Sequence, residues 1–468
     1  MSVLGAARQF GVPPQTLRDR VKGTIDIDTV KSGKSPVLSA EEEALIVDHL
    51  KQMASLGYGY TRTEVVDIAT DYAVIAGKRD HNNPFTLRWY SGFMGRWPEL
   101  KLVKPRSLEL QRAKAGNKGN VSAYFSELND IITKYELNDK PHLIFNVDEK
   151  GIQQNHTPPG VVAGRNICVQ EVTSPKSSTT TIIGCGSASG VAIPPYFVFA
   201  GARTRQELLA GKSAGADGTV SESGWSNSVI FRDYLEHHFL KYVPGRGDDP
   251  VLLILDGHKS HVSVGLTDWA RQQNIIIFVL PAHTSHFLQP LDVGCYGPFH
   301  NIYNNECHKQ MRKASSVITR YNICEIACKV YSLALSPENL RNAFRRAGIF
   351  PLDQTVIKEE YLLPSEAFEE KEEENKENED VQTQNDEITP EHDEQDEPIS
   401  AAKFLTSKVE AVRKVKSEGK KKERKTMSKI TSGHCITEET VVDKMRQHQE
   451  CNETGKKINR KEEKSNTN

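Results

Sequence analysis

The spacing of apolar residues divides the 468-residue chain into four zones. Residues 1–24 and 36–115 place apolar positions at helical spacing, so each predicts a small all-helical unit. Residues 140–355 alternate short apolar runs with helical patterns, which predicts an α/β domain whose helices pack against a sheet. From residue 358 onward aromatic residues are few and charged residues dominate, so this zone predicts a disordered tail, acidic and then basic.

The first zone predicts two short helices around a tight turn. Gly11 can adopt the positive φ that such a turn needs, and Pro13 and Pro14 end one helix and begin the next. Leu17 and Val21 would face inward on the second helix. This is the layout of a helix-turn-helix, whose second helix enters the major groove of DNA, although an ordinary corner between two helices fits equally well. The side chains expected to face DNA are Gln15, Thr16, Arg18 and Arg20.

The second zone begins with a capping box, in which Ser39 starts a helix and Glu42 completes the cap. Trp89, Phe93 and Trp97 are four residues apart and predict one aromatic stripe, which we expect in the core rather than stacked on bases. The basic residues around this stripe suit phosphate contacts, and a solvated basic face is a competing explanation. These residues are Arg88, Arg96, Lys101, Lys104 and Arg106.

Charge is arranged in blocks, although the formal net charge is only −2. Residues 1–120 hold 18 Lys/Arg against 13 Asp/Glu, residues 359–397 hold 18 acids against two lysines, and residues 403–425 hold ten Lys/Arg against three Glu. Such blocks indicate a nucleic-acid-binding end and solvated tails. One basic cluster resembles a nuclear localisation patch, with a plain solvated run as the alternative. It comprises Lys420, Lys421, Lys422, Arg424 and Lys425.

Two classes of protein are disfavoured by the composition. No apolar run approaches the roughly 20 residues that cross a bilayer, so we expect no membrane partner. The eight cysteines are scattered along a long chain, which is typical of a reducing compartment rather than of a disulfide scaffold.

Three aspartates adjoin the buried strands expected in the α/β zone. Asp148 follows one short apolar run, and Asp256 follows another. Asp292 starts a helical pattern beyond a third strand, 36 positions after Asp256. Because ligands in open α/β sheets bind beyond the carboxyl ends of strands, we expect the three carboxylates to converge. Each one alone is also explained as a turn former or a helix cap.

Converging carboxylates provide the oxygen ligands that Mg²⁺ prefers. Two such ions can activate a water or a 3′-hydroxyl and stabilise the leaving oxygen, as cutting and rejoining a phosphodiester requires. His258 and His261 flank the second aspartate and can contact the phosphate or position water. Turn or packing roles explain these histidines about as well.

At these residues the sequence resembles a known family. The segments FNVDEKGI, LLILDGHKSH and LPAHTSHFLQPLDVGCYGPFH resemble the catalytic core of pogo/Tigger-like transposases, with their jerky-type and centromere-protein-B-like relatives. The segment LRNAFRRAGIFPLD is similar to the family's closing helix. The first zone is similar to a pipsqueak-type helix-turn-helix that lacks its leading helix, and residues 36–115 are similar to a centromere-protein-B-type helix-turn-helix.

The resemblance implies a DDE superfamily endonuclease domain at residues 120–357, with a ribonuclease H-like mixed sheet flanked by helices. It implies that Asp148, Asp256 and Asp292 form a catalytic and metal-binding triad for Mg²⁺ or Mn²⁺. The implied partner is double-stranded DNA, at terminal inverted repeats and TA target sites, and the implied setting is a nuclear protein able to form a homodimer. The first motif departs from many relatives, because Lys150 stands where they have threonine. A host-domesticated, sequence-specific nuclear DNA-binding protein without catalytic activity is the alternative.

Overall fold

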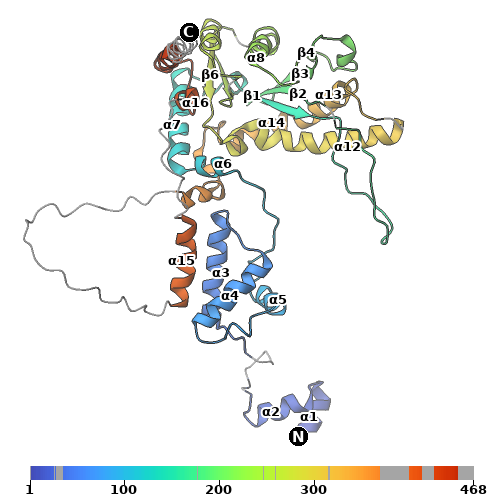
Figure 1. The fold of residues 1–468 in the computed structure, drawn as a ribbon, viewed down its shortest axis with the longest axis vertical. Coiled ribbons are helices and arrows are strands. Elements are labelled where there is room, and N and C mark those ends of the chain that lie inside the picture. The colour runs from blue at the N-terminus through green and yellow to red at the C-terminus, as the bar shows by residue number, and fades with distance from the viewer. Residues whose placement is uncertain are drawn as a thin grey trace, which may run out of the picture. The chain divides into compact units, whose positions relative to one another are not determined.

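A computed structural model of the chain describes residues 2–25, 27, 35–176, 178–245, 247–258, 260–314, 317–368, 400–413 and 426–451. The chain forms two compact units (Figure 1). The first unit comprises residues 1–54, 58–103 and 380–410, and the second comprises residues 55–57, 104–379 and 411–468. Because the division falls after Val103, Lys104 and Arg106 belong to the second unit.

The first two helices, α1 (Val3–Phe10) and α2 (Pro14–Val21), enclose the predicted turn. Gly11 has φ 65° and ends α1, so the expectation of a left-handed turn is confirmed. The apolar residues of these two helices are only partly buried. Ala7 is buried, but Phe10 and Val21 are 69% and 71% exposed. The prediction that Val21 faces inward is therefore wrong, because α1 and α2 together cover too little surface to bury it.

Three further helices form the rest of the N-terminal region: α3 (Ala40–Ser55), α4 (Arg62–Ile75) and α5 (Leu87–Arg96). The capping box is confirmed, since the backbone N–H of Ser39 donates to Glu42 and that of Glu42 donates to the Ser39 hydroxyl. The aromatic stripe lies in the core, as predicted. Phe93 is fully buried and stacks on Trp89 at a ring distance of 5.0 Å.

The second unit is built on a mixed sheet with six strands in the described residues, in the order β4-β3-β2-β1-β5-β6. Strands β1, β2 and β3 pair antiparallel, whereas β5 pairs parallel with β1 and β6 pairs parallel with β5. This arrangement confirms the predicted ribonuclease H-like fold class. The strands are β1 (Ile144–Ile152), β2 (Thr180–Ser187), β3 (Ala192–Ala200), β4 (Asp217–Ser221), β5 (Val251–Leu255) and β6 (Ile275–Val279).

Helices cover both faces of this sheet (Figure 1). Alternate residues of a strand point to opposite faces. Accordingly Ile183 joins one apolar cluster with α7 and α10, while Ile182 joins another with α12 and α13. The helices and helical turns of this unit are α6 (Leu110–Ala115), α7 (Lys118–Lys134), η1 (Pro141–Leu143), η2 (Gln206–Leu209), α8 (Ser228–Asp233), η3 (Tyr234–Phe239), α9 (Leu240–Tyr242), α10 (Val264–Gln272), α11 (Ser285–Leu288), η4 (Leu291–Cys295), α12 (Tyr296–Ala314), α13 (Ile323–Ala334), α14 (Pro337–Arg346), η5 (Gln354–Val356), η6 (Glu359–Tyr361), η7 (Leu363–Ala367) and α16 (Met427–Thr431).

The prediction that residues 358–468 are disordered is wrong for the three described segments of this zone, residues 358–368, 400–413 and 426–451. Residues 369–399, 414–425 and 452–468 lie outside the described residues. Helix α15 (Ala401–Arg413) packs Leu405 into the core of the first unit. Residues 432–437 lie antiparallel along β6, where the N–H of Ile436 donates to the carbonyl of Ile277 at 2.9 Å. Ile436 and Met445 are fully buried in the second unit. Apolar residues spaced within a charged zone therefore supply enough burial to order these segments.

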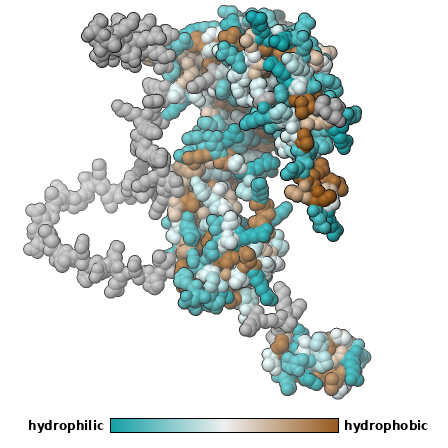
Figure 2. Space-filling view, turned by 45° about the vertical axis from the view of Figure 1, so that its right-hand side comes forward, coloured by the Kyte–Doolittle hydropathy of each residue, from teal (hydrophilic) through white to brown (hydrophobic). Residues whose placement is uncertain are grey.

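A long connection, residues 153–179, joins β1 to β2 and projects from the sheet (Figure 1). Apolar side chains gather on this projection (Figure 2), among them Val162 and Val172. Across the part of the chain that the structure describes, no helix is both long and apolar enough to span a bilayer.

Candidate active site

Strand register brings Asp148 and Asp256 to the same level of the sheet. Strand β1 pairs with β5 in parallel, and the last partners are Asn146 and Ile254. Each aspartate lies two residues beyond its member of this pair, so the two acids stand at the same edge and on corresponding faces. The expectation that β1 ends at Asp148 is wrong, because β1 continues to Ile152. It continues by pairing with β2 alone, as the register of Asp148 with Gly184 shows.

Asp292 reaches the same region from a different element. The chain leaves β6, forms the short helix α11, and then the π-helical turn η4, in which Asp292 is the second residue. Helix α12 continues directly from this turn, so the expectation that Asp292 begins a helix is confirmed.

The three carboxylates are close enough to influence one another's protonation. Burial raises the pKa of Asp148 well above its usual value, and the charges of Asp292 and Asp256 raise it further. Burial also raises the pKa of Asp292, against the opposing charges of Lys150 and Arg112. The site therefore concentrates negative charge that a cation would neutralise.

His261 joins Asp256 to a fourth acid, Glu149. Its Nδ1 lies 2.7 Å from Asp256 Oδ1, and its Nε2 lies 2.9 Å from Glu149 Oε1. Burial alone would lower the pKa of His261, but these two carboxylate contacts outweigh it and raise the pKa to about 9. Burial likewise opposes ionisation of Asp256, yet the hydrogen bond from His261 leaves the pKa of Asp256 below its usual value. Asp256 is thus held ionised and oriented.

His258 has a different setting from His261. Its side chain is exposed and its Nδ1 lies 2.6 Å from the Ser260 hydroxyl. Only its backbone N–H reaches the second aspartate, at 3.2 Å from Asp256 Oδ1. The imidazole of His258 is accordingly open to solvent, whereas that of His261 is held between two carboxylates.

A buried amide, Asn146, connects the segments that carry the three aspartates. Its Nδ2 donates to the Ile254 carbonyl at 2.9 Å and to Gln289 Oε1 at 3.0 Å. Its Oδ1 accepts from the backbone N–H of Leu291 at 3.0 Å. Neither Asn146 nor Gln289 is among the site residues predicted from the sequence. A signal was present, because Asn146 is a polar residue inside an otherwise apolar run, and such a residue needs buried partners.

Tyr296 contacts the backbone of β1 at the first aspartate. Its hydroxyl donates to the Asp148 carbonyl at 2.7 Å, and it passes beside Gly184 on the neighbouring strand. A Cβ at Gly184 would lie 2.6 Å from that hydroxyl oxygen, so only glycine admits the contact.

This donor set fits a divalent metal ion. Asp148, Asp256 and Asp292 supply carboxylate oxygens of the kind that Mg²⁺ and Mn²⁺ bind. The electrostatic coupling that raises the pKa of Asp148 is the repulsion that such a cation relieves. His261 occupies one oxygen of Asp256 and leaves the other free for a metal.

The residues predicted to contact DNA fall into several settings. Gln15, Arg18 and Arg88 are exposed, as are Lys101, Lys104 and Arg106, while Thr16 and Arg20 are half-buried. One guanidinium N–H of Arg20 donates to the Ile27 carbonyl. The nuclear localisation cluster, residues 420–425, lies outside the described residues.

Arg96 is already engaged within the fold. Its Nε donates to Glu43 at 2.9 Å, and Trp97 Nε1 donates to the same carboxylate at 2.9 Å. The Glu43 side chain is only 3% exposed, so its charge needs these donors. Arg96 thus has a structural partner in Glu43, while the residue itself is exposed.

A mixed sheet flanked by helices, with acids at the carboxyl edge of two adjacent parallel strands, defines a ribonuclease H-like α/β domain. Residues 176–344 match the sequence model of the DDE superfamily endonuclease family. Asp256 and Asp292 lie inside the matched segment, and Asp148 precedes it.

Two curated fungal proteins are similar to parts of the chain. One is the MFS-type transporter clz9 of Cochliobolus lunatus, which is 33% identical over 182 residues, 38% of this chain and 19% of that protein. The other is the Chaetoglobosin A biosynthesis cluster protein C of Chaetomium globosum, which is 28% identical over 167 residues, 36% of this chain and 39% of that protein. The matches thus span well under half of either relative.

Among solved structures, the mariner Mos1 paired-end complex with Mg aligns with a TM-score of 0.41 and 15% identity, covering 73% of this chain and 91% of that one. The Mos1 paired-end complex with the left transposon end aligns with a TM-score of 0.38 and 14% identity. That alignment covers 74% of this chain and 93% of the other.

Proposed function

We propose that this protein is a pogo/Tigger-like DNA transposase, or a transposase-derived protein, whose second unit cleaves and joins DNA strands with a divalent metal. The observation that carries the proposal is the meeting of three aspartates from separate elements. Parallel register sets two of them level, and the third arrives from the turn before α12. Three carboxylates that repel one another, of which Asp148 is buried, destabilise a fold that gives them no counter-ion, so their meeting favours a cation site.

In this proposal Asp148, Asp256 and Asp292 hold Mg²⁺ or Mn²⁺, which supplies charge neutralisation at the phosphate and an activated water or 3′-hydroxyl. His261 is a positioning residue that fixes the orientation of Asp256 and keeps it ionised. The exposed imidazole of His258 faces solvent beside the site and can donate to a phosphate oxygen. Lys150 and Arg112 add positive charge near Asp292, which favours the approach of an anionic strand.

DNA binding is assigned to the helical N-terminal region. The polar face of α2 presents Gln15 and Arg18, and the connection after α5 presents Lys101. Phosphate contacts from such side chains release counterions, so affinity should fall steeply with salt. Action in the nucleus at terminal inverted repeats, as a homodimer, belongs to the same proposal.

The test measures metal binding and DNA nicking with the full chain. We expect Mn²⁺ to bind in an electron paramagnetic resonance titration and Mg²⁺ to support nicking of a supercoiled plasmid. Asp256→Asn should lose both while the protein remains folded, with a Tm below that of the wild type because the contact of ionised Asp256 with His261 is lost. Asp130→Asn, which changes an exposed aspartate on α7, is the matched control and should behave as wild type.

Binding of DNA by a folded chain that takes up no Mn²⁺ and cuts no plasmid would overturn the catalytic proposal. That result would favour the host-domesticated DNA-binding protein. Nicking that survives Asp256→Asn would show that the activity comes from elsewhere.

A further inference from the structure

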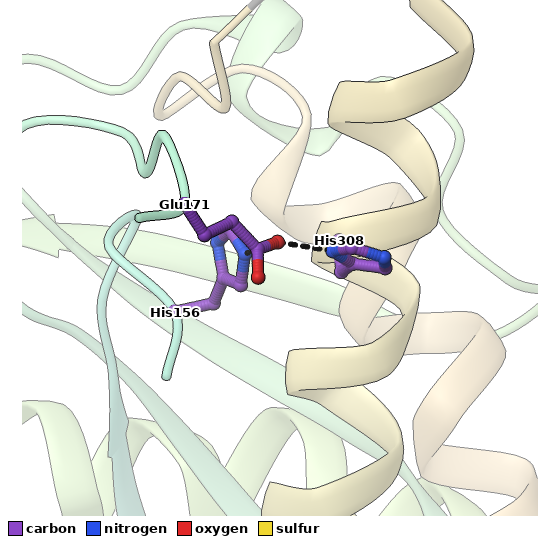
Figure 3. A group of neighbouring side chains, drawn as sticks. All are labelled: His156, Glu171 and His308. Atoms are coloured by element: carbon purple, nitrogen blue, oxygen red, sulfur yellow. Dashed lines mark hydrogen bonds and ion pairs between the residues drawn. The ribbon is translucent and has the colours of Figure 1, made fainter. Parts of the chain in front are cut away.

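Two histidines and a glutamate meet at the base of the long connection between β1 and β2 (Figure 3). His156 and Glu171 come from the two arms of this connection, and His308 comes from α12. One ligand atom from each residue lies within 4.8 Å of the others. The Glu171 carboxylate is hydrogen-bonded to Nδ1 of His308 and lies 3.9 Å from Nε2 of His156.

The burial of this cluster is unusual for polar groups with so few partners. The His156 side chain is 0% exposed, and neither of its ring nitrogens has a hydrogen-bond partner. The second carboxylate oxygen of Glu171 is also buried without a partner. Leaving buried polar groups unpaired is unfavourable, so an arrangement that retains them calls for a ligand.

We propose that His156, Glu171 and His308 bind a zinc ion. Two imidazoles and one carboxylate are a donor set that Zn²⁺ accepts, with a water completing four-fold coordination. Imidazole nitrogens also favour zinc over Mg²⁺, which prefers oxygen ligands. The site is therefore chemically distinct from the three aspartates, whose donors are all carboxylate oxygens.

The geometry needs only a small contraction to close on the metal. Zinc bonds of about 2.0–2.1 Å in a tetrahedron place neighbouring ligand atoms roughly 3.3 Å apart. The contact of 3.9 Å between His156 and Glu171 is within reach of side-chain rotation. His308 Nε2 and the second Glu171 oxygen remain available for the metal or for hydrogen bonds that fix the ligands, as is usual around zinc.

The consequence of the metal would be to fasten the long connection to α12. Hydrogen bonds among the described residues already join the two: the Thr157 backbone N–H donates to Asn304 Oδ1 at 3.1 Å, and the Tyr303 hydroxyl donates to the Gln153 carbonyl at 3.0 Å. The metal would add a tie that involves both arms of the connection. Between the ligands, residues 157–170 are almost entirely exposed and carry apolar side chains such as Val162. Zinc would close this stretch into a loop with both ends held, which limits its conformational freedom.

The first measurement is a Zn²⁺ titration of the full chain against a chromogenic chelator. We expect one equivalent of zinc to be lost in His156→Gln and in His308→Gln, with at least about a 100-fold weakening at this site, since even outer-shell changes cost 10–100-fold. His300→Gln is the matched control, because His300 lies on the same helix, is exposed, and contacts only Asn304 among the described partners. Unchanged zinc stoichiometry in both ligand variants would overturn the proposal.

The second measurement is trypsin cleavage at Arg165, an exposed residue between the two arms of the loop. Zinc should slow this cleavage in the wild type and in His300→Gln, but not in His308→Gln. A zinc effect that persists in His308→Gln would also overturn the proposal, because it would show that protection arises elsewhere.

Both measurements should be repeated in Asp256→Asn. We expect zinc binding and loop protection to be unchanged in Asp256→Asn. The zinc proposal and the proposal for the three aspartates can therefore be tested independently.

Discussion

At the scale of single residues, the candidate active site depends on one buried amide as much as on its acids. Asn146 is fully buried and is hydrogen-bonded to a backbone carbonyl of β5, to Gln289, and to the turn that carries Asp292. The three segments are far apart in sequence, and local structure alone does not align them. A single side chain with two donors and an acceptor can do so.

We predict that Asn146→Ala destabilises the protein by roughly 3 kcal/mol, because it leaves several buried polar groups without partners. Chemical denaturation measures this loss, and Mn²⁺ affinity should fall with it. Asn301→Ala removes an exposed amide on α12 and should change neither quantity. Equal stability of Asn146→Ala and the wild type would show that the amide network is dispensable.

Two arginines of α5 should have opposite roles. Arg96→Ala breaks the contact with buried Glu43 and should destabilise the protein by about 2 kcal/mol. Arg88→Ala removes the same charge from an exposed position, so it should leave the Tm unchanged. If Arg88 contacts phosphate, Arg88→Ala should also reduce the slope of the logarithm of DNA affinity against the logarithm of salt concentration by about one. Unfolding curves and DNA titrations at several salt concentrations test both statements.

At the scale of elements, the sequence predicts the strands better than their ends. The apolar runs around Asp148 and Asp256 correctly predict β1 and β5, and their shared level follows from parallel pairing. The continuation of β1 to Ile152 could not be foreseen, because it depends on β2, whose register is set by non-local packing. The contact between Arg96 and Glu43 could not be foreseen either, because the two residues are 53 positions apart in sequence.

The segment that lies along β6 carries a pH-sensitive contact. Nδ1 of His434 is hydrogen-bonded to Glu127 on α7, and this contact raises the pKa of His434. A raised folded-state pKa means that the stabilisation is complete below the unfolded value of about 6.5 and is lost as pH rises through the folded value.

We therefore predict that the Tm difference between wild type and His434→Gln is largest near pH 6 and shrinks by pH 8.5. The corresponding difference in the free energy of unfolding should stay below about 1 kcal/mol, because the His434 side chain is 45% exposed. Thermal unfolding of the two proteins across this range is the measurement, and a difference that grows with pH would contradict the assignment.

At the scale of the whole molecule, the second unit is completed by residues from the far end of the chain. Residues 432–437 cover β6, which would otherwise be an open strand edge, and Ile436 and Met445 fill its core. Open edges of this kind pair with other chains. The sequence did not predict that this segment covers β6, because a few apolar residues within a highly charged zone have the composition of a solvated tail.

We predict that a chain ending at residue 425 unfolds at a lower temperature than the full chain and forms oligomers on size-exclusion chromatography. A chain ending at Cys451 keeps the covering segment and should elute and unfold as the full chain does. Identical behaviour of the two truncated chains would show that the covering segment contributes nothing to the sheet.

The covering of β6 also implies a delay during synthesis, because the strand is made before the segment that covers it. The residues that shield β6 follow it by roughly 160 positions, which a ribosome translating at about 5–20 residues per second needs on the order of 8–30 seconds to produce. During that interval a nascent chain presents the strand Ile275–Val279 with one side unpaired. Neighbouring nascent chains on one messenger RNA would meet through this edge, and slower translation between the two segments should lower the yield of monomeric protein.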